Sequence, residues 1–139
     1  MLLRLKIVLS VCLLVGFLGF SQDKEGNIYL SVDVRPKHGK CDESAKPEAC
    51  TTEQIFKFIQ SEIFYPIDSR RNKIEGTVEI EFVINKRGKV RKVKVLHGVN
   101  EELDEEAKRV IKKLPRFEPA KKDGKAVAFY YVIPITFQL

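Results

Sequence analysis

Three residues in the first half of the chain, His38, Cys41 and Cys50, have side chains that could do chemistry. Two cysteines at this separation can form a disulfide in an oxidising compartment. With His38 they could instead supply three ligands to Zn²⁺, but no fourth ligand lies at a usual spacing. The disulfide is therefore expected, and free thiols only if the chain is never exported.

A second candidate for chemistry is an acidic cluster that could form a paired-carboxylate active site. Basic residues follow the cluster directly, and apolar residues recur through it at helical spacing. Acids near a helix N-terminus and bases near its C-terminus each complement the helix dipole by about 0.3–1 kcal/mol. The cluster therefore predicts a charged helix rather than a catalytic site; its members are Glu101, Glu102, Asp104, Glu105 and Glu106.

A run of cations could instead bind nucleic acid or another anionic surface. The whole chain carries a net charge of +6. Phosphate-binding surfaces usually add interleaved aromatics or a reading helix, which this run lacks. A solvated surface without nucleic acid is therefore the expectation; the run consists of Lys86, Arg87, Lys89, Arg91, Lys92 and Lys94.

We find no sequence pattern of an enzyme. The chain has no arrangement of Ser, Cys or His typical of a nucleophile and its base, no glycine-rich phosphate loop and no metal cluster. His97 precedes Gly98 at a predicted strand end, where it is expected to be a turn residue. A non-enzymatic protein without catalytic residues, cofactor or metal is predicted.

Residues 1–21 have the features of a secretory signal. Arg4 and Lys6 precede an apolar run from Ile7 to Phe20, and small residues occupy the positions that a signal peptidase reads. The run is shorter than the roughly 20 residues that span a membrane. Cleavage after Ser21 and export to the periplasm are expected, with retention as an inner-membrane anchor as the alternative. Cys12 leaves with the signal, and the mature chain keeps Cys41 and Cys50.

The mature chain divides into a polar arm and one folded domain. Residues 22–51 form the arm, with a short apolar alternation from Ile28 to Val34. The domain, residues 52–139, begins with a helix capped by Thr51 and stopped at Tyr65-Pro66. We expect Ile67 to Glu75 to be a connection.

Three strands and a second helix follow. Alternation begins at Thr77, continues after the turn Asn85–Gly88, and returns in the last strand, Val127 to Phe137. Asn100 can cap the intervening helix, whose apolar stripe is Leu103, Ala107, Val110, Ile111 and Leu114. The predicted fold class is α+β: a three-stranded antiparallel/mixed sheet of order 2-1-3, with two helices packed on one face.

Several short motifs together resemble the C-terminal domain of TonB energy transducers over about residues 52–139. They are Tyr65-Pro66, Ile74 to Val78, Leu103 to Ala107, Phe117 to Ala120 and Val132 to Phe137. The arm, with Cys41 and Cys50, is similar to the TonB-like proteins common in Bacteroidetes-type bacteria. Within this resemblance, Tyr65 and Pro66 match the family's helix stop and Gly76 the start of its central strand. The basic loop between them is expected to be solvated.

The resemblance implies a periplasmic domain that adds a short segment, the TonB box, of an outer-membrane receptor to its sheet edge. A complete transducer of this family needs a membrane helix with polar residues that engage a proton-driven motor, and a long spacer across the periplasm. Here the apolar run has no histidine, and residues 22–51 span at most about 100 Å. A stand-alone binding module in TonB-linked transport is predicted. The alternatives are a minimal membrane-anchored transducer and a structural module that forms strand-exchanged homodimers.

Strand parity predicts which residues would meet the partner. Pro134 has no N–H, and proline is tolerated where that donor would face away from the neighbouring strand. Residues of its parity, Ala128, Tyr130, Val132 and Thr136, should then present their backbone groups at the edge. Val127, Phe129, Tyr131 and Ile133 should bond to the central strand and bury their side chains.

Both processing expectations can be tested by one measurement of mass. The intact protein isolated from the envelope under non-reducing conditions should begin at Gln22 and have the mass of a chain with one disulfide. A mass that matches two free thiols would contradict the disulfide, and a retained N-terminus would favour the anchored form.

Overall fold

The computed structural model describes residues 26–139, so the predicted signal, including Cys12, lies outside the described residues. The first elements are β1 (Ile28–Tyr29), a 3₁₀ turn η1 (Gly39–Cys41), α1 (Pro47–Glu62) and α2 (Ile67–Arg71). They are followed by β2 (Gly76–Ile84), β3 (Val90–His97), α3 (Glu101–Lys112), β4 (Ala120–Lys122) and β5 (Lys125–Phe137). Among residues 26–139, no helix combines the length and apolar character needed to cross a membrane.

The sheet confirms the predicted strand order and extends it. Its order is β1-β5-β2-β3, with β4 paired to β5, so the three expected strands lie as β3, β2 and β5. β2 is antiparallel to both neighbours. The three-stranded count was too low, because Lys122 and Lys125 close a hairpin and β1 adds a short parallel strand. Positive φ at both Asp123 and Gly124 fits the tight type I′ turn that such a hairpin needs.

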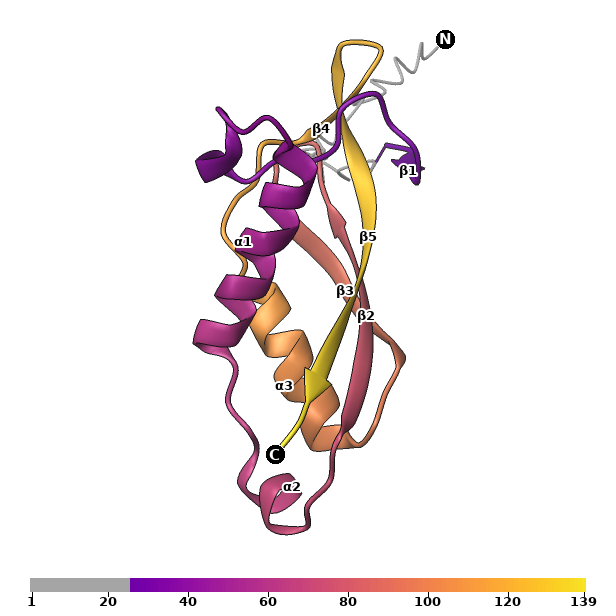
Figure 1. The fold of residues 1–139 in the computed structure, drawn as a ribbon. Coiled ribbons are helices and arrows are strands. Elements are labelled where there is room, and N and C mark those ends of the chain that lie inside the picture. The colour runs from indigo at the N-terminus through magenta and orange to yellow at the C-terminus, as the bar shows by residue number, and fades with distance from the viewer. Residues whose placement is uncertain (1–25) are drawn as a thin grey trace, which may run out of the picture.

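Both long helices lie on one side of the sheet and enclose the core against it (Figure 1). All the residues predicted for the α3 stripe are buried, as are the inward residues of β2, Val78, Ile80, Phe82 and Ile84. Asn100 caps α3 as expected, because its side chain accepts a hydrogen bond of 2.9 Å from the backbone N–H of Leu103. The amphipathic patterns of β2 and α3 therefore determine the main layer contact.

A bulge explains the irregular apolar spacing of β3. Glu81 pairs with Lys94 but Val83 pairs with Arg91, so β3 has one extra residue between these pairs. Lys92 has a φ of 53° at this point. The extra residue allows both Val90 and Val93 to pack against the core.

The start of α1 and the connection between α1 and β2 both differ from what the sequence predicted. α1 begins at Pro47, which suits the first helical turn, so Thr51 lies inside the helix and does not cap it. Thr51 is fully buried, and its hydroxyl accepts a hydrogen bond of 3.0 Å from the backbone N–H of His38.

The expected connection from Ile67 to Glu75 contains the short helix α2, whose buried Ser69 donates its hydroxyl to the carboxylate of Glu102 at 2.7 Å. This contact fixes α2 against the start of α3.

One member of the acidic cluster has a structural role that the sequence did not reveal. Glu106 is buried, accepts a hydrogen bond of 3.0 Å from the backbone N–H of Phe64, and lies 2.6 Å from the guanidinium of Arg109. Arg109 in turn donates to the carbonyl of Glu62 at 2.9 Å, and its hydrogen bonds to the carboxylate of Glu106 raise the pKa of Arg109. Glu106 thus connects α3 to the segment that follows α1.

We predict that Glu106→Ala lowers the free energy of unfolding by about 1–3 kcal/mol, because it leaves the N–H of Phe64 and the guanidinium of Arg109 without their acceptor. Glu105 is exposed on the same helix, so Glu105→Ala is the matched control and should change stability by less than about 0.5 kcal/mol. Urea denaturation of both variants provides the comparison. Equal losses would contradict the assigned role of Glu106.

Candidate partner-binding edge

The C-terminal strand β5 has one covered edge and one partly free edge. Along the covered edge, β2 pairs with every residue from Phe129 to Phe137 in an uninterrupted antiparallel register. Along the other edge, β1 pairs only with Ala128 and Phe129. No strand of the described residues pairs with that edge from Tyr130 to Phe137.

The predicted edge residues lie on the face of the sheet that the helices do not cover. Val132 is 42% exposed, and Thr136 is exposed with its hydroxyl 3.0 Å from that of Thr77. Tyr130 is half-buried and donates its hydroxyl to the carboxylate of Glu81. This hydrogen bond, and to a smaller extent burial, raises the pKa of Tyr130. Of the alternate residues, Phe129 and Ile133 are buried, as their parity predicted, and Tyr131 is half-buried. Val127 is also half-buried, but it pairs with Ala120 of β4 and not with the central strand as predicted, because β2 ends opposite Phe129.

Ala128 differs from the other residues of its set, because the structure gives it a partner within the chain. Its Cα partner is Ile28 of β1, and its side chain is buried. The alternation from Ile28 to Val34 was the sequence signal for this contact, but it could not show which strand the arm would join. The available part of the edge therefore begins at Tyr130.

The arm is held against the domain by two further contacts after β1. Val34 exchanges backbone hydrogen bonds of 3.0 and 2.8 Å with Lys121, and Lys37 exchanges bonds of 3.0 and 2.8 Å with Glu118. The ammonium of Lys37 also lies 2.8 Å from the carboxylate of Asp42 and 3.1 Å from that of Glu118, and these bonds raise the pKa of Lys37. The arm is thus paired to the domain rather than extended away from it.

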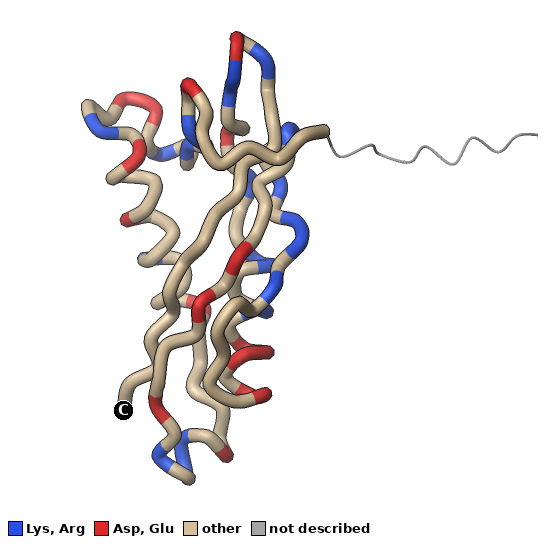
Figure 2. The backbone as a smooth tube through the Cα atoms, turned by 90° about the vertical axis from the view of Figure 1, so that its right-hand side faces the viewer, with Lys and Arg blue, Asp and Glu red and all other residues tan. Residues whose placement is uncertain are grey.

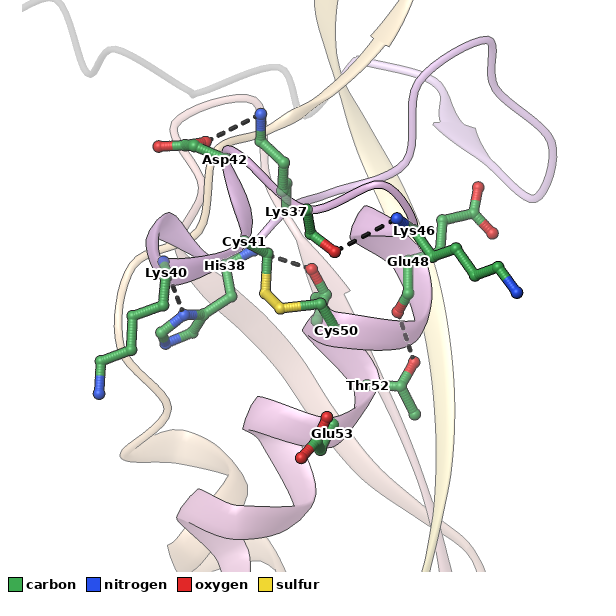
Figure 3. Close-up of a disulfide and its surroundings, with 12 residues drawn as sticks. Lys37, His38, Lys40, Cys41, Asp42, Lys46, Glu48, Cys50, Thr52 and Glu53 are labelled. Atoms are coloured by element: carbon green, nitrogen blue, oxygen red, sulfur yellow. Dashed lines mark hydrogen bonds and ion pairs between the residues drawn. A yellow bond between two sulfur atoms is a disulfide. The ribbon is translucent and has the colours of Figure 1, made fainter.

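The predicted disulfide between Cys41 and Cys50 is present and joins η1 to the first turn of α1 (Figure 3). The two Cα atoms are 5.8 Å apart, and Cys41 is fully buried. The alternative zinc site is wrong, because both thiols are consumed and Nδ1 of His38 accepts a hydrogen bond of 3.2 Å from the N–H of Lys40. Among the described residues, no group of three or more potential ligands could hold a metal ion.

The three motif residues position the start of β2. Tyr65 packs its ring edge-on to Phe137 with centroids 5.6 Å apart, and its hydroxyl donates to the carbonyl of Ile74. Burial is the main cause of the raised pKa of Tyr65. Pro66 precedes α2 with an extended backbone, and Gly76 begins β2. These residues therefore carry the chain from α1 into the central strand and hold that strand beside the end of β5.

The charged residues considered as sites lie elsewhere on the molecule. Arg70, Arg71 and Lys73 are exposed around the end of α2. Figure 2 shows many Lys and Arg positions gathered along one side of the upper half of the molecule. His97 ends β3 and lies on the helix-free face with its ring nitrogen 2.6 Å from the carboxylate of Glu79. None of these residues lies at the free edge of β5.

Comparison with known proteins establishes the family of this fold. Residues 61–139, more than half of the chain, match the family described as the Gram-negative bacterial TonB protein C-terminal. The chain therefore belongs to the TonB C-terminal family, as the sequence motifs indicated. TonB C-terminal domains are non-enzymatic binding and transducer modules that are associated with the cell envelope and its transport.

Two solved structures are also similar to this chain. The solution structure of the Helicobacter pylori TonB C-terminal domain is 27% identical with a TM-score of 0.52, covering 63% of this chain and 79% of that one. The solution structure of the Pseudomonas aeruginosa domain is 31% identical, with a TM-score of 0.46, and covers 55% of this chain and 78% of that one. A search of curated proteins gave no match.

We predict that Gly76→Ala destabilises the start of β2. Gly76 has a φ of +155°, and a Cβ at this position would lie 2.7 Å from a methyl group of Val99. A side chain in such backbone geometry costs about 1–3 kcal/mol, and Val99 must also move. Gly39→Ala is the matched control, because a Cβ there meets no atom within 4 Å. Thermal melts that show equal losses for both variants would contradict this account.

Proposed function

We propose that this protein is an exported periplasmic module that binds an extended segment of an outer-membrane receptor, or of another envelope protein, in TonB-linked transport. The segment adds as a strand to the free edge of β5, in the manner of β-augmentation. The observation that carries the proposal is the unpaired edge from Tyr130 to Phe137, in a family of envelope binding modules.

The backbone of this edge suits strand addition. Pro134 pairs with Glu79 and has no N–H to donate, so this pair belongs to the non-hydrogen-bonded kind. Because the register from Phe129 to Phe137 contains no shift, the same parity applies to Tyr130, Val132 and Thr136. Their N–H and C=O groups then face away from β2 and are available to a partner strand.

The extent of the edge limits what can bind. β1 ends the available stretch at Phe129, so the partner segment lies along Tyr130 to Phe137, about 26 Å at the usual strand rise. Backbone hydrogen bonds provide the affinity, and alternate side chains of the partner provide the selectivity. Val132 is the large apolar side chain exposed on this strand, and it favours an apolar partner residue beside it.

The free edge of β5 would bind a partner whether the N-terminal signal is cleaved or retained. Removal of the signal gives a free periplasmic module, whereas retention would place the edge on an inner-membrane anchor, as in a minimal transducer. Homodimerisation through β5 is a competing use of this edge, since an unpaired strand can also pair with its copy.

We predict that Val132→Pro weakens partner capture about tenfold, because one lost backbone hydrogen bond at an edge costs on the order of 1 kcal/mol or more. Val132→Ile is the matched control: it keeps the N–H and an apolar β-branched side chain, and should capture as well as the original protein. Solubilised outer membranes of the source organism supply the partner, with captured receptors identified and quantified by mass spectrometry.

Three further variants separate binding from folding. Tyr130→Pro should behave like Val132→Pro, with moderate loss of stability, whereas Phe129→Pro and Tyr131→Pro should unfold the domain, because their donors face β2. Unimpaired capture by the two outward variants, or equal destabilisation of both sets, would exclude the edge as the binding surface. Sedimentation across a concentration series would reveal a homodimer if β5 pairs with its own copy instead.

A further inference from the structure

A cavity of about 330 Å³ opens at the end of the sheet where the β2–β3 turn, the start of β5 and the arm meet. Its volume lies at the lower end of the range for small-molecule sites, about 300–1,000 Å³. The lining comes from three segments that are distant in sequence, and it includes none of the edge residues from Tyr130 to Phe137. The cavity is therefore separate from the proposed partner-binding edge.

The lining is strongly cationic. Lys86, Arg87, Lys89 and Arg91 all line the cavity, and no Asp or Glu does. Within residues 26–139, none of these four residues forms an ion pair with a carboxylate. By contrast, Lys37 of the arm and three cations of the long helices, Lys57, Lys108 and Arg109, each form one. Four like charges within six residues repel one another, and a bound anion would relieve that repulsion.

The turn that carries these cations is rigid. The side chain of Asn85 accepts hydrogen bonds from the backbone N–H groups of Arg87 at 3.0 Å and Lys89 at 2.9 Å. Gly88 has a φ of +79°, and its carbonyl accepts from the N–H of Phe117 at 2.8 Å. The cationic side chains therefore extend from a backbone that is fixed before any ligand arrives, which lowers the ordering cost of binding.

Part of the remaining wall of the cavity is apolar, beside the polar side chains of Asn27 and Asn85. Ala128 is buried, Val127 is half-buried, and Tyr29 of the arm adds its ring. The ammonium of Lys122 lies 4.6 Å from the centre of the Tyr29 ring, which adds a further cation beside this wall. A ligand that fits therefore has an anionic group and a small body that can lie against apolar surface.

We propose that this cavity binds a phosphate group carried on a small organic body. A phosphate carries a charge of about −1.5 to −2 and three acceptor oxygens, and arginine binds it through two parallel hydrogen bonds. Arg87 and Arg91 supply such forks, with Lys86 and Lys89 as additional charges. The phosphate could belong to a soluble metabolite or to a lipid headgroup, since both present the same group. Nucleic acid fits less well, because Tyr29 is the single aromatic residue of the lining and stacking needs several.

The test uses the exported protein, labelled with ¹⁵N, and follows its amide resonances in low salt. The first probe is glycerol 3-phosphate; the second is vesicles of phosphatidic acid in phosphatidylcholine, scored by co-sedimentation. Saturable shifts at Arg87, Lys89 and Ala128 with the first probe support a soluble ligand. Co-sedimentation with the vesicles, compared with phosphatidylcholine alone, supports a lipid headgroup.

Two double variants distinguish binding at this cavity from a general effect of the protein's net charge. Arg87→Ala combined with Arg91→Ala should weaken binding at least about tenfold through loss of two charge-assisted forks. Lys40→Ala combined with Lys112→Ala removes the same charge from exposed positions outside the cavity and should leave affinity unchanged. Val132→Pro should also bind the phosphate probe normally, so failure of the edge proposal would not affect this result.

Three outcomes would overturn the proposal. The first is the absence of saturable binding to either probe, and the second is an equal loss of affinity in the two double variants. The third is binding of a single-stranded oligonucleotide by a protein that binds neither phosphate probe.

Discussion

The pairing of β2 with β5 is the constraint on which the rest of the structure depends. Nine consecutive residue pairs align without a shift, so every inward residue of β2 meets an inward residue of β5. Phe82 and Tyr131, for example, stack with ring centroids 5.5 Å apart. A slip of one residue would turn the apolar row of one strand toward water, so burial of this face also fixes the register. The helices pack on the resulting surface, and α3 provides most of the apolar contact.

The same register decides how the opposite edge of β5 can be used. With Pro134 opposite Glu79, the parity of the whole strand is set, and the edge beyond Phe129 remains without a partner in residues 26–139. On that edge β1 of the arm covers Ala128 and Phe129, and the Cys41–Cys50 disulfide ties the arm to α1. Exposed sheet edges are usually shortened or covered. Here the covering stops partway, which is consistent with an edge reserved for binding.

The charges divide into two groups with different surroundings. On the helices, acids and bases mostly pair with each other, and Glu106 with Arg109 forms a partly buried connection between two elements. At the β2–β3 turn, cations surround a cavity without a carboxylate. This arrangement separates the proposed partner-binding edge from the proposed phosphate pocket, and the two share no residue.

The sequence by itself determined the two long helices and the three main strands, the inward faces of β2 and α3, the Asn100 cap, the disulfide and the family, because local periodicity, capping and cysteine spacing carry that information. It did not determine the start of α1 at Pro47, where the buried contact between Thr51 and His38 outweighed the capping preference of Thr51. Nor did it show that Ile28 would pair with Ala128, that Glu106 would be buried, or that the cations near Arg87 would enclose a cavity. Those features depend on contacts between residues far apart in the chain, which only the tertiary structure brings together.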